Sequence, residues 1–253
     1  MDLANKVIMI VGASSGIGKS LAQKLVEKKS KLILLARSFD KLEKIKDENP
    51  NAEIDIYRCD VSDKTTVKLV FEEVKRKHNF IDMVILNSAV SHRMKVENFN
   101  SELAEETISI NFLGMIYCIE QILPIYLKEK KGIIVGVSSL ADNRGYSGSG
   151  FYCASKSAVT TYLEGLSVEL KNHNVKVITI KPGFVKTPMT DKNEFEMPFL
   201  MDSDKASEVI IKGLEKEKRF IQFPFPTVIG SKIIGIIPNR LYEYLSYKFN
   251  IVG

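Results

Sequence analysis

The stretch VGASSGIGKS, residues 11–20, places three glycines directly after a short apolar run and before a segment with helical periodicity. Glycine lets the backbone turn tightly and approach a diphosphate, whose charge suits the N-terminus of the helix that follows. The spacing is GxxxGxG rather than the GxGxxG of the usual dinucleotide fingerprint. A tight turn alone would also explain the glycines, but their place after the first predicted strand favours a nucleotide-cofactor site.

Short apolar runs recur along the chain and alternate with amphipathic segments such as residues 19–29 and 64–78. The runs are nearly continuous in Val, Ile and Leu, which is typical of strands buried on both faces. They cover residues 7–11, 32–36, 54–59, 83–86, 133–137, 175–180 and 220–223. The alternation predicts an α/β fold: a single Rossmann-type, doubly wound domain of about seven parallel strands with helices on both faces.

The composition is that of an ordinary globular protein, with 253 residues, 45% hydrophobic and 26% charged, and a net charge of +5. The lysines are scattered, which argues against a nucleic-acid partner. The three cysteines form no CxxC pair and the three histidines lack metal-ligand spacing, so we expect neither disulfides nor a metal site. The acidic second residue and the early first strand do not match a signal peptide, so we expect a cytoplasmic protein.

Arg37 follows the second predicted strand, where many nucleotide-binding folds carry an acidic residue for the ribose 2′-hydroxyl. An arginine there can bind a 2′-phosphate through charge-assisted hydrogen bonds, with help from Ser14 or Lys19. The alternative is that Arg37 only ends a strand at the surface. The pattern favours NADP over NAD as the cofactor.

Asp60 and Val61 follow the third predicted strand. The Asp60 carboxylate either accepts a hydrogen bond from an adenine amino group or caps the next helix, which is expected to begin near Lys64. The sequence leaves both interpretations open.

The stretch FYCASKSA, residues 151–158, holds Tyr152 and Lys156 four residues apart, on one face of a helix. A nearby ammonium favours the phenolate, so we expect Lys156 to lower the Tyr152 pKa from about 10 and to let Tyr152 exchange a proton with a carbonyl or alcohol oxygen. YxxxK is common by chance and on an isolated helix would be structural. Ser139, beyond the run 133–137, adds a hydroxyl at the strand end, where parallel sheets bind ligands.

Asn111 lies in the apolar stretch ISINFLG, which is helical by its pattern. A buried asparagine needs hydrogen-bond partners. It either satisfies a local backbone group or holds a water in a proton relay that reaches Lys156.

In combination, these motifs resemble the short-chain dehydrogenase/reductase family, NADP-preferring type, over about the first 190 residues. The resemblance implies that Tyr152 is the acid–base group, that Lys156 lowers its pKa and binds the nicotinamide ribose, that Ser139 positions the substrate oxygen and that Asn111 supports a proton relay. The cofactor-binding residues that it implies are Gly12, Ser14, Ser15, Gly16, Ile17, Gly18, Arg37, Asp60, Val61, Asn87, Ala89, Tyr152, Lys156, Pro182, Gly183, Val185 and Thr187.

The chain departs from the family pattern at two positions. Val11 replaces the threonine that usually precedes the first glycine, and Val90 replaces the last glycine of the Asn-Asn-Ala-Gly motif. Because valine does not readily adopt a positive φ, the second change is expected to affect how the cofactor is seated rather than the chemistry.

We expect residues 1–190 to form the dinucleotide-binding and catalytic core, and residues 191–253 a variable substrate-covering region and apolar tail of the same domain. The stretch FEMPFLM, residues 195–201, predicts either a loop or short helix that closes over an apolar substrate, or a plain packed helix. The tail 224–253 is too broken by Pro, Gly and Lys for a membrane span. It is expected to cover a hydrophobic pocket, to form a subunit contact, or to attach peripherally to a membrane.

We therefore expect an NADP(H)-dependent oxidoreductase that transfers a hydride between nicotinamide and a ketone or secondary alcohol, bulky or lipid-like. This is chemistry of the carbonyl reductase or alcohol dehydrogenase type. The alternatives are a catalytically silent NADP(H)-binding sensor or scaffold, or an epimerase or dehydratase on the same fold. The resemblance also implies a homodimer or homotetramer, formed through the helices after Asn98 and Phe151.

Overall fold

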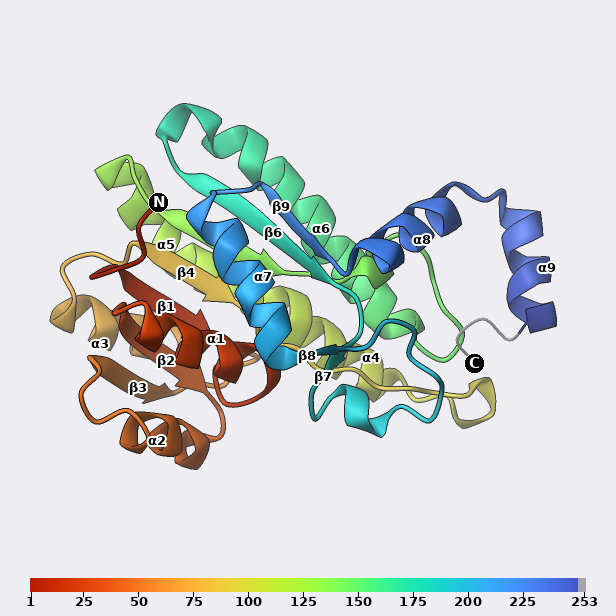
Figure 1. Ribbon diagram of the computed structural model, residues 1–253, viewed down its shortest axis with the longest axis horizontal. Helices are drawn as coiled ribbons and strands as arrows, with labels where there is room; N and C mark the ends of the chain where they lie inside the picture. The colour runs from red at the N-terminus through yellow and green to blue at the C-terminus, as the bar shows by residue number, and fades with distance from the viewer. Residues whose placement is uncertain (250–253) are drawn as a thin grey trace.

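A parallel β-sheet forms the centre of the molecule (Figure 1). The computed structural model describes residues 1–249, and seven of the strands in this range pair in the order β3-β2-β1-β4-β5-β6-β9. They are β1 (Val7–Val11), β2 (Lys31–Ala36), β3 (Ile54–Arg58), β4 (Met83–Leu86), β5 (Ile133–Val137), β6 (Lys176–Pro182) and β9 (Phe220–Phe223). The strand order reverses between β1 and β4, and such a switch point opens a ligand crevice at the carboxyl ends of the strands.

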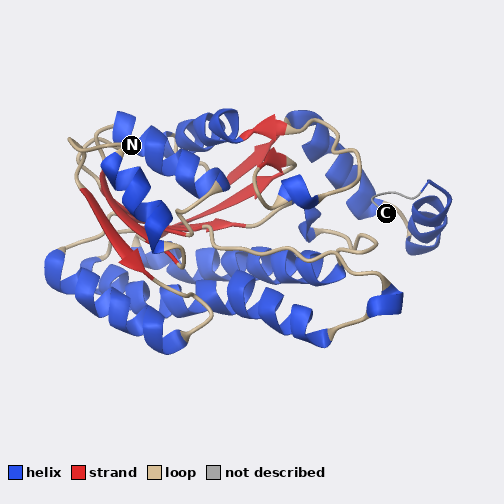
Figure 2. Cartoon of the chain, turned by 90° about the horizontal axis from the view of Figure 1, so that it is seen from below, coloured by secondary structure: helices blue, strands red, loops and turns tan. Residues whose placement is uncertain are grey.

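Helices cover both faces of the sheet (Figure 2). Side chains alternate along a strand. On β1, Ile8 and Ile10 therefore pack into one core, while Met9 and Val11 pack into the other. The first core is covered by α1 (Gly16–Glu27), α2 (Phe39–Asp47) and α7 (Ser203–Glu215), and the second by α3 (Lys64–Lys77), α5 (Gly114–Glu129) and α6 (Gly150–Glu169). The predicted doubly wound α/β fold is confirmed. Four of the seven strands have the predicted limits, and β2, β3 and β6 differ from them by one or two residues.

The segment Ser101–Glu129 is one continuous helical stretch. It consists of α4 (Ser101–Ile108), the π-helical turn η2 (Ser109–Leu113) and α5. Within the described range, it alone has the length and apolar composition of a membrane-crossing helix. Its apolar residues Cys118, Ile119 and Ile122 pack into the second core, and 39% of its most apolar 18 residues is buried.

The rest of the chain lies mostly around the carboxyl ends of the strands. Short 3₁₀ turns are η1 (Val96–Asn98), η3 (Leu140–Asp142), η4 (Leu170–His173) and η5 (Thr190–Lys192), and β7 (Val185–Lys186) pairs in parallel with β8 (Met201–Asp202). The stretch 195–200 is a loop, one of the two predicted forms. Two last helices, α8 (Phe225–Ile236) and α9 (Asn239–Phe249), extend from one end of the molecule (Figure 1).

Candidate active site

The glycine-rich turn between β1 and α1 lets two stretches of backbone approach closely. Gly12 has a φ of +88°, and a Cβ added there would lie 2.7 Å from the backbone nitrogen of Ser88. A Cβ on Gly18 would lie 2.1 Å from the Gly12 carbonyl oxygen. Asn87 at the end of β4 donates its side-chain amide to the same carbonyl over 2.9 Å. The turn therefore depends on glycine and is held against the neighbouring strand end.

The residues of this turn suit a phosphate group. Helix α1 begins after Ser15, whose side chain makes no capping hydrogen bond, and its first turn holds no acidic residue. Free backbone N–H groups and the positive end of the helix dipole stabilise an anion at such a position. A cleft of about 330 Å³ opens over the turn. The turn and the cleft therefore fit the diphosphate of a dinucleotide cofactor.

Most of the sequence-predicted site residues line this one cleft. They are Gly12, Ser14, Ser15, Gly16, Ile17, Arg37, Asp60, Val61, Asn87, Ala89, Ser139, Tyr152, Lys156, Pro182, Gly183, Val185 and Thr187. Gly18 and Asn111 are not part of the lining: Gly18 supports the turn, and Asn111 is buried behind it.

The sequence analysis missed several residues of the cleft wall. Ser38, Lys41, Ser88 and Met189 all line it. Lys41 carried a usable signal, because it lies four residues after Arg37 at the start of an amphipathic helix. The others come from loops whose place depends on the tertiary fold.

Arg37 and Asp60 face each other at the adenosine end expected for the cleft. The Arg37 guanidinium lies 4.0 Å from the Asp60 carboxylate, and 56% of the arginine side chain is exposed. The helix-cap interpretation of Asp60 is wrong: Asp63 caps α3 by accepting a hydrogen bond from the Thr65 backbone N–H. Lys19 is not among the residues that line the cleft, and its ammonium lies 3.9 Å from the Glu48 carboxylate.

Asn111 lies in the π-helical turn rather than in a regular α-helix. Its side-chain oxygen accepts the Val90 backbone N–H at 2.7 Å, and its amide donates to the Val90 carbonyl at 2.9 Å and to the Ser155 hydroxyl at 3.0 Å. The side chain therefore satisfies backbone groups of the loop after β4, and its role in a proton relay stays a prediction. Val90 keeps a negative φ, so its backbone adapts to valine without strain.

Ser139, Tyr152 and Lys156 meet where β5 ends and α6 begins. The Ser139 hydroxyl hydrogen-bonds Tyr152 and accepts the Ala141 backbone N–H at 3.1 Å. The Lys156 ammonium is buried, donates to the Val137 carbonyl at 2.9 Å and lies 5.7 Å from the centre of the Tyr152 ring. The three side chains therefore share one corner of the cleft.

The expected lowering of the Tyr152 pKa is wrong in this structure. Burial raises the pKa of the phenol to about 12, and the hydrogen bond from Ser139 opposes that rise without overcoming it. Burial also lowers the pKa of Lys156 to about 8. In both cases loss of solvent disfavours the charged form. Tyr152 therefore holds its proton at neutral pH.

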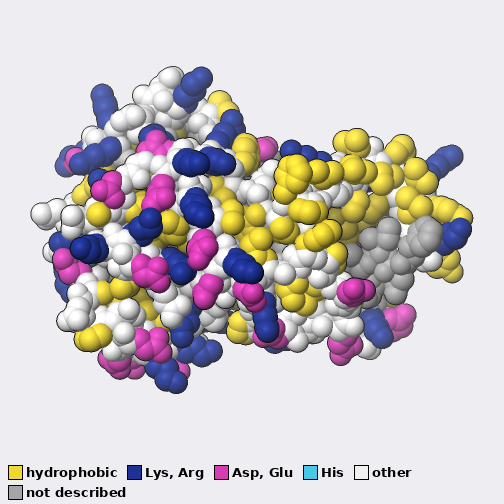
Figure 3. Space-filling view, in the orientation of Figure 1, with side chains coloured by type: hydrophobic (Ala, Val, Ile, Leu, Met, Phe, Trp, Pro, Cys, Tyr) yellow, Lys and Arg dark blue, Asp and Glu magenta, His cyan; other side chains and the backbone are white. Residues whose placement is uncertain are grey.

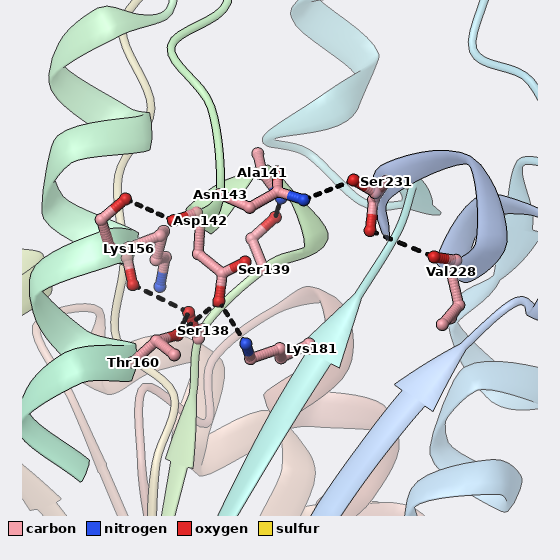
Figure 4. Close-up of polar contacts among 11 residues, drawn as sticks. Ser138, Ser139, Ala141, Asp142, Asn143, Lys156, Thr160, Lys181, Val228 and Ser231 are labelled. Atoms are coloured by element: carbon pink, nitrogen blue, oxygen red, sulfur yellow. Dashed lines mark hydrogen bonds and ion pairs between the residues drawn. The ribbon is translucent and has the colours of Figure 1, made fainter. Parts of the chain in front are cut away.

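A buried polar network lies behind these residues (Figure 4). The Asp142 carboxylate pairs with the Lys181 ammonium at 2.7 Å and accepts the Thr160 hydroxyl at 2.5 Å. The Ser138 hydroxyl lies 2.7 Å from the Thr160 hydroxyl and 3.0 Å from the Lys156 carbonyl, and its single proton can be donated to either one. Because Asp142 is three residues after Ser139, the network ties the serine segment to β6 and α6. Breaking such a buried pair costs far more than breaking a surface pair.

A second, apolar pocket of about 360 Å³ adjoins the cleft. Ser139, Tyr152, Gly183, Met189 and Thr190 line both cavities. The rest of the wall combines four aromatic side chains with aliphatic and small polar ones, and no Asp, Glu, Lys or Arg of the described chain lines it. The wall draws on four separate segments and includes Tyr146, Phe184, Phe195, Phe199, Thr227, Ser231 and Ile234.

Comparison with known proteins gives consistent matches. Residues 6–197 match the family described as short chain dehydrogenase. An oxidoreductase of Myxococcus xanthus is 30% identical over 245 residues, which cover 96% of both chains. An oxidoreductase of Listeria monocytogenes is 33% identical over 254 residues, covering 99% of this chain and 92% of its own.

Solved structures share the fold. A short-chain dehydrogenase/reductase of Burkholderia phymatum in complex with NAD superposes with a TM-score of 0.84 at 20% identity, over 92% of this chain and 93% of its own. An alcohol dehydrogenase of Thermococcus sibiricus complexed with 5-hydroxy-NADP gives a TM-score of 0.77 at 26% identity, over 86% and 94%. A short-chain dehydrogenase of Burkholderia cenocepacia in complex with NADP gives 0.83 at 21% identity, over 97% and 99%.

Proposed function

The chain belongs to the short-chain dehydrogenase family of oxidoreductases, and from this premise we propose that it is an NADP(H)-dependent reductase of bulky, uncharged ketones. The reverse reaction would oxidise the corresponding secondary alcohols. One observation carries the proposal: Ser139 and Tyr152 line both the polar cleft and the apolar pocket. A carbonyl oxygen at this junction would meet two hydroxyl groups, with its apolar substituents in the second cavity.

The residues where the cleft and the apolar pocket meet would transfer the proton to or from the substrate oxygen. The bound nicotinamide supplies the hydride in reduction, or accepts it in oxidation. Tyr152 is protonated at neutral pH, because burial raises its pKa to about 12, and it gives that proton to the substrate oxygen as the carbonyl becomes an alcohol. The Ser139 hydroxyl holds the same oxygen. The buried Lys156 ammonium stabilises the phenolate that remains, because an opposite charge nearby favours the ionised form.

The preference for NADP rests on the end of the cleft around Arg37. Arg37 and Lys41 line the cleft there, and β2 ends in Ala36 without a carboxylate for a ribose 2′-hydroxyl. Two cations beside Ser14 and Ser38 suit a 2′-phosphate. The Asp60 carboxylate, 4.0 Å from Arg37, reduces this positive charge but does not enclose the guanidinium. The family's solved relatives include complexes with NADP and with NAD, so the choice rests on these side chains.

The substrate class follows from the second cavity. A mostly apolar wall without a charged side chain favours an apolar ligand, since a charged group would lose its hydration without a partner. The cavity of about 360 Å³ leaves room for substituents well beyond a methyl group. A bulky or lipid-like ketone fits these properties.

The assembly and the location of the protein complete the proposal. We place the subunit contact of a homodimer or homotetramer on α4, α5 and α6. Val168 on α6 is 69% exposed there, and Phe112 beside α5 is half-buried. The protein would act in the cytoplasm, where NADPH is available.

Turnover with a graded substrate series tests the proposal. Purified protein is mixed with NADPH or NADH and with ketones of increasing apolar size, and cofactor oxidation is followed. We expect faster turnover with NADPH than with NADH, and values of kcat/KM that rise with ketone size. The Tyr152→Phe variant should lose at least about 100-fold in kcat and still bind NADPH. NADPH binding without turnover of any ketone would instead support a sensor or scaffold.

A further inference from the structure

The outer surface of α8 and α9 carries large apolar side chains. On α8, Phe225, Ile229, Ile233 and Ile236 follow each other at helical spacing, with exposed fractions of 75%, 43%, 54% and 83%. On α9, Tyr244 and Tyr247 are 57% and 92% exposed. Figure 3 shows a broad hydrophobic patch over α8. We call these six residues the α8–α9 face.

Polar contacts on the inner side fix the orientation of this face. Arg144 donates from Nε to the Ile234 carbonyl at 3.1 Å and from Nη1 to the Asn239 side chain at 2.7 Å. The Tyr242 hydroxyl donates to the Gly145 carbonyl at 2.7 Å. The Asn143 amide donates to the Ser231 carbonyl at 2.5 Å (Figure 4). The two helices are therefore anchored to the loop after Ser139, and their apolar outer side is held toward the solvent.

Exposed cations surround the apolar side chains. Lys232, Arg240 and Lys248 lie on α8 and α9, where Glu243 is the only acidic residue of residues 225–249. All four are exposed. The Lys248 ammonium also lies over the Tyr244 ring, 5.6 Å from its centre. Apolar residues, tyrosines and a positive balance on one surface are the features of a helix that lies in a membrane interface.

We propose that the α8–α9 face docks on the surface of a lipid bilayer that contains anionic lipid. A second copy of the chain is the other candidate for covering this face. A symmetric contact between two copies would place this positively charged surface against an identical one, and like charges disfavour such a contact. An anionic bilayer neutralises these cations and buries the isoleucines and the phenylalanine at once.

Docking would place the apolar pocket next to the lipid. The inner side of α8 supplies Thr227, Gly230, Ser231 and Ile234 to the wall of that pocket, while its outer side carries the α8–α9 face. One helix thus separates the bilayer surface from the bound substrate. The delivery of a lipid-like ketone along this helix rests on the proposed function; the docking itself does not.

Vesicle flotation of the full chain tests the docking. The probes are vesicles of phosphatidylcholine alone and of phosphatidylcholine mixed with phosphatidylglycerol. We expect the wild type to float with the anionic vesicles. The double variant Ile233→Glu/Ile236→Glu should lose at least about tenfold in bound fraction, because two charges enter the apolar face. Lys232→Gln should weaken binding to the anionic vesicles about fivefold and leave the neutral ones unaffected.

A matched control tests whether loss of flotation is specific to the α8–α9 face or follows from removing any exposed apolar side chain. Leu69→Glu changes a leucine that is 60% exposed on α3, far along the chain, and should float like the wild type. Thermal melts of the isoleucine variant show whether it folds, and both of its sites are more than half exposed.

The docking would be overturned if the wild type did not float with anionic vesicles, or if the Ile233→Glu/Ile236→Glu variant floated equally well. It would also be overturned if the wild type self-associated, the variant did not, and neither protein bound vesicles. The last result would assign the face to a second copy. NADPH oxidation with a small soluble ketone, measured without vesicles, tests the proposed function separately. A failure of docking would leave that turnover intact.

Discussion

The two cavities that meet at Tyr152 are similar in volume, about 330 and 360 Å³, and opposite in construction. The cleft is built largely from backbone turns and small polar residues at strand ends, such as Gly12 and Ser15. The apolar pocket is lined by side chains from loops, such as Phe184 and Phe199, and from α8, such as Ile234. The first therefore depends on backbone geometry and the second on side-chain area, and they should respond to different substitutions.

The largest expected effect comes from a single methyl group in the cleft. Gly12→Ala forces a Cβ to within 2.7 Å of the Ser88 backbone at a φ of +88°. The turn must move, so we expect NADPH affinity to fall at least about 100-fold, together with a loss of thermal stability. Titration of cofactor fluorescence measures the affinity.

Gly165→Ala is the control for this glycine. It lies within α6 with no atom close to the added Cβ, so it should leave the affinity unchanged and stabilise the helix by about 0.5–1 kcal/mol. Full NADPH affinity in Gly12→Ala would contradict the role of the backbone in the cleft.

Arg37→Ala tests the charged end of the same cleft. We expect NADPH to bind about 10- to 100-fold more weakly, because charge-assisted hydrogen bonds to a 2′-phosphate are lost, while NADH affinity changes little. Calorimetric titration with both cofactors measures the ratio. Arg58→Ala, an exposed arginine at the end of β3 outside the cleft, is the matched control. Equal losses for both cofactors would contradict a phosphate-binding role.

Phe184→Ala tests the apolar pocket. Phe184 lines the pocket and stacks edge-on against Phe195, with ring centres 5.8 Å apart. Removing the ring should lower kcat/KM about tenfold for a bulky ketone, with little change for a small one and none in NADPH affinity. Phe80→Ala removes a ring from a similar pair, with Tyr126, outside the pocket and should change neither value. A loss that is independent of ketone size would show that Phe184 only stabilises the fold.

The smallest expected effect is on the stability of the fold, which the buried charge of Lys156 lowers where the two cavities meet. Burial lowers the Lys156 pKa from 10.5 to about 8, so the folded protein carries an unfavourable buried charge at pH 7. Lys156→Met should abolish turnover and stabilise the fold at pH 7 by about 1–2 kcal/mol. Between pH 8 and 10.5, Lys156 is protonated in the unfolded chain and neutral in the folded chain. The free energy of unfolding of the wild type therefore rises with pH, and the stability difference between Lys156→Met and the wild type becomes smaller.

Denaturant melts of both proteins at pH 7 and pH 9.5 measure this difference. Lys171→Met, in the turn after α6, changes an exposed lysine and should stay within about 0.5 kcal/mol of the wild type at both values. A difference that stays constant with pH would show that lysine ionisation is not its cause.

The two cavities also differ in how far the sequence predicts them. Buried parallel strands appear in the sequence as apolar runs, and a glycine-rich turn follows the first of them at the cleft. The sheet and the cleft could therefore both be predicted from local patterns. Tyr152 and Lys156 share one helix turn, and Ser139 ends a strand, so their meeting also follows from the fold. Their catalytic roles stay predictions.

The remainder depends on tertiary structure. The wall of the apolar pocket comes from loops and helices that are distant in the sequence and share no pattern, so only its apolar character could be expected from residues 195–201. The raised pKa of Tyr152 reflects burial, and helical spacing to Lys156 carries no information about burial. Asp63 rather than Asp60 caps α3 because the chain makes one more turn before the helix begins.

Transfer of deuterium from cofactor to substrate tests the central claim most directly. Purified protein is incubated with NADPH that carries deuterium at both C4 positions and with a bulky apolar ketone, and the product is analysed by mass spectrometry. The structure predicts an alcohol with deuterium on its carbinol carbon, and at least about 100-fold less of it with Tyr152→Phe. Tight NADPH binding without deuterium in any product would contradict a reductase and leave a cofactor-binding sensor as the function of this fold.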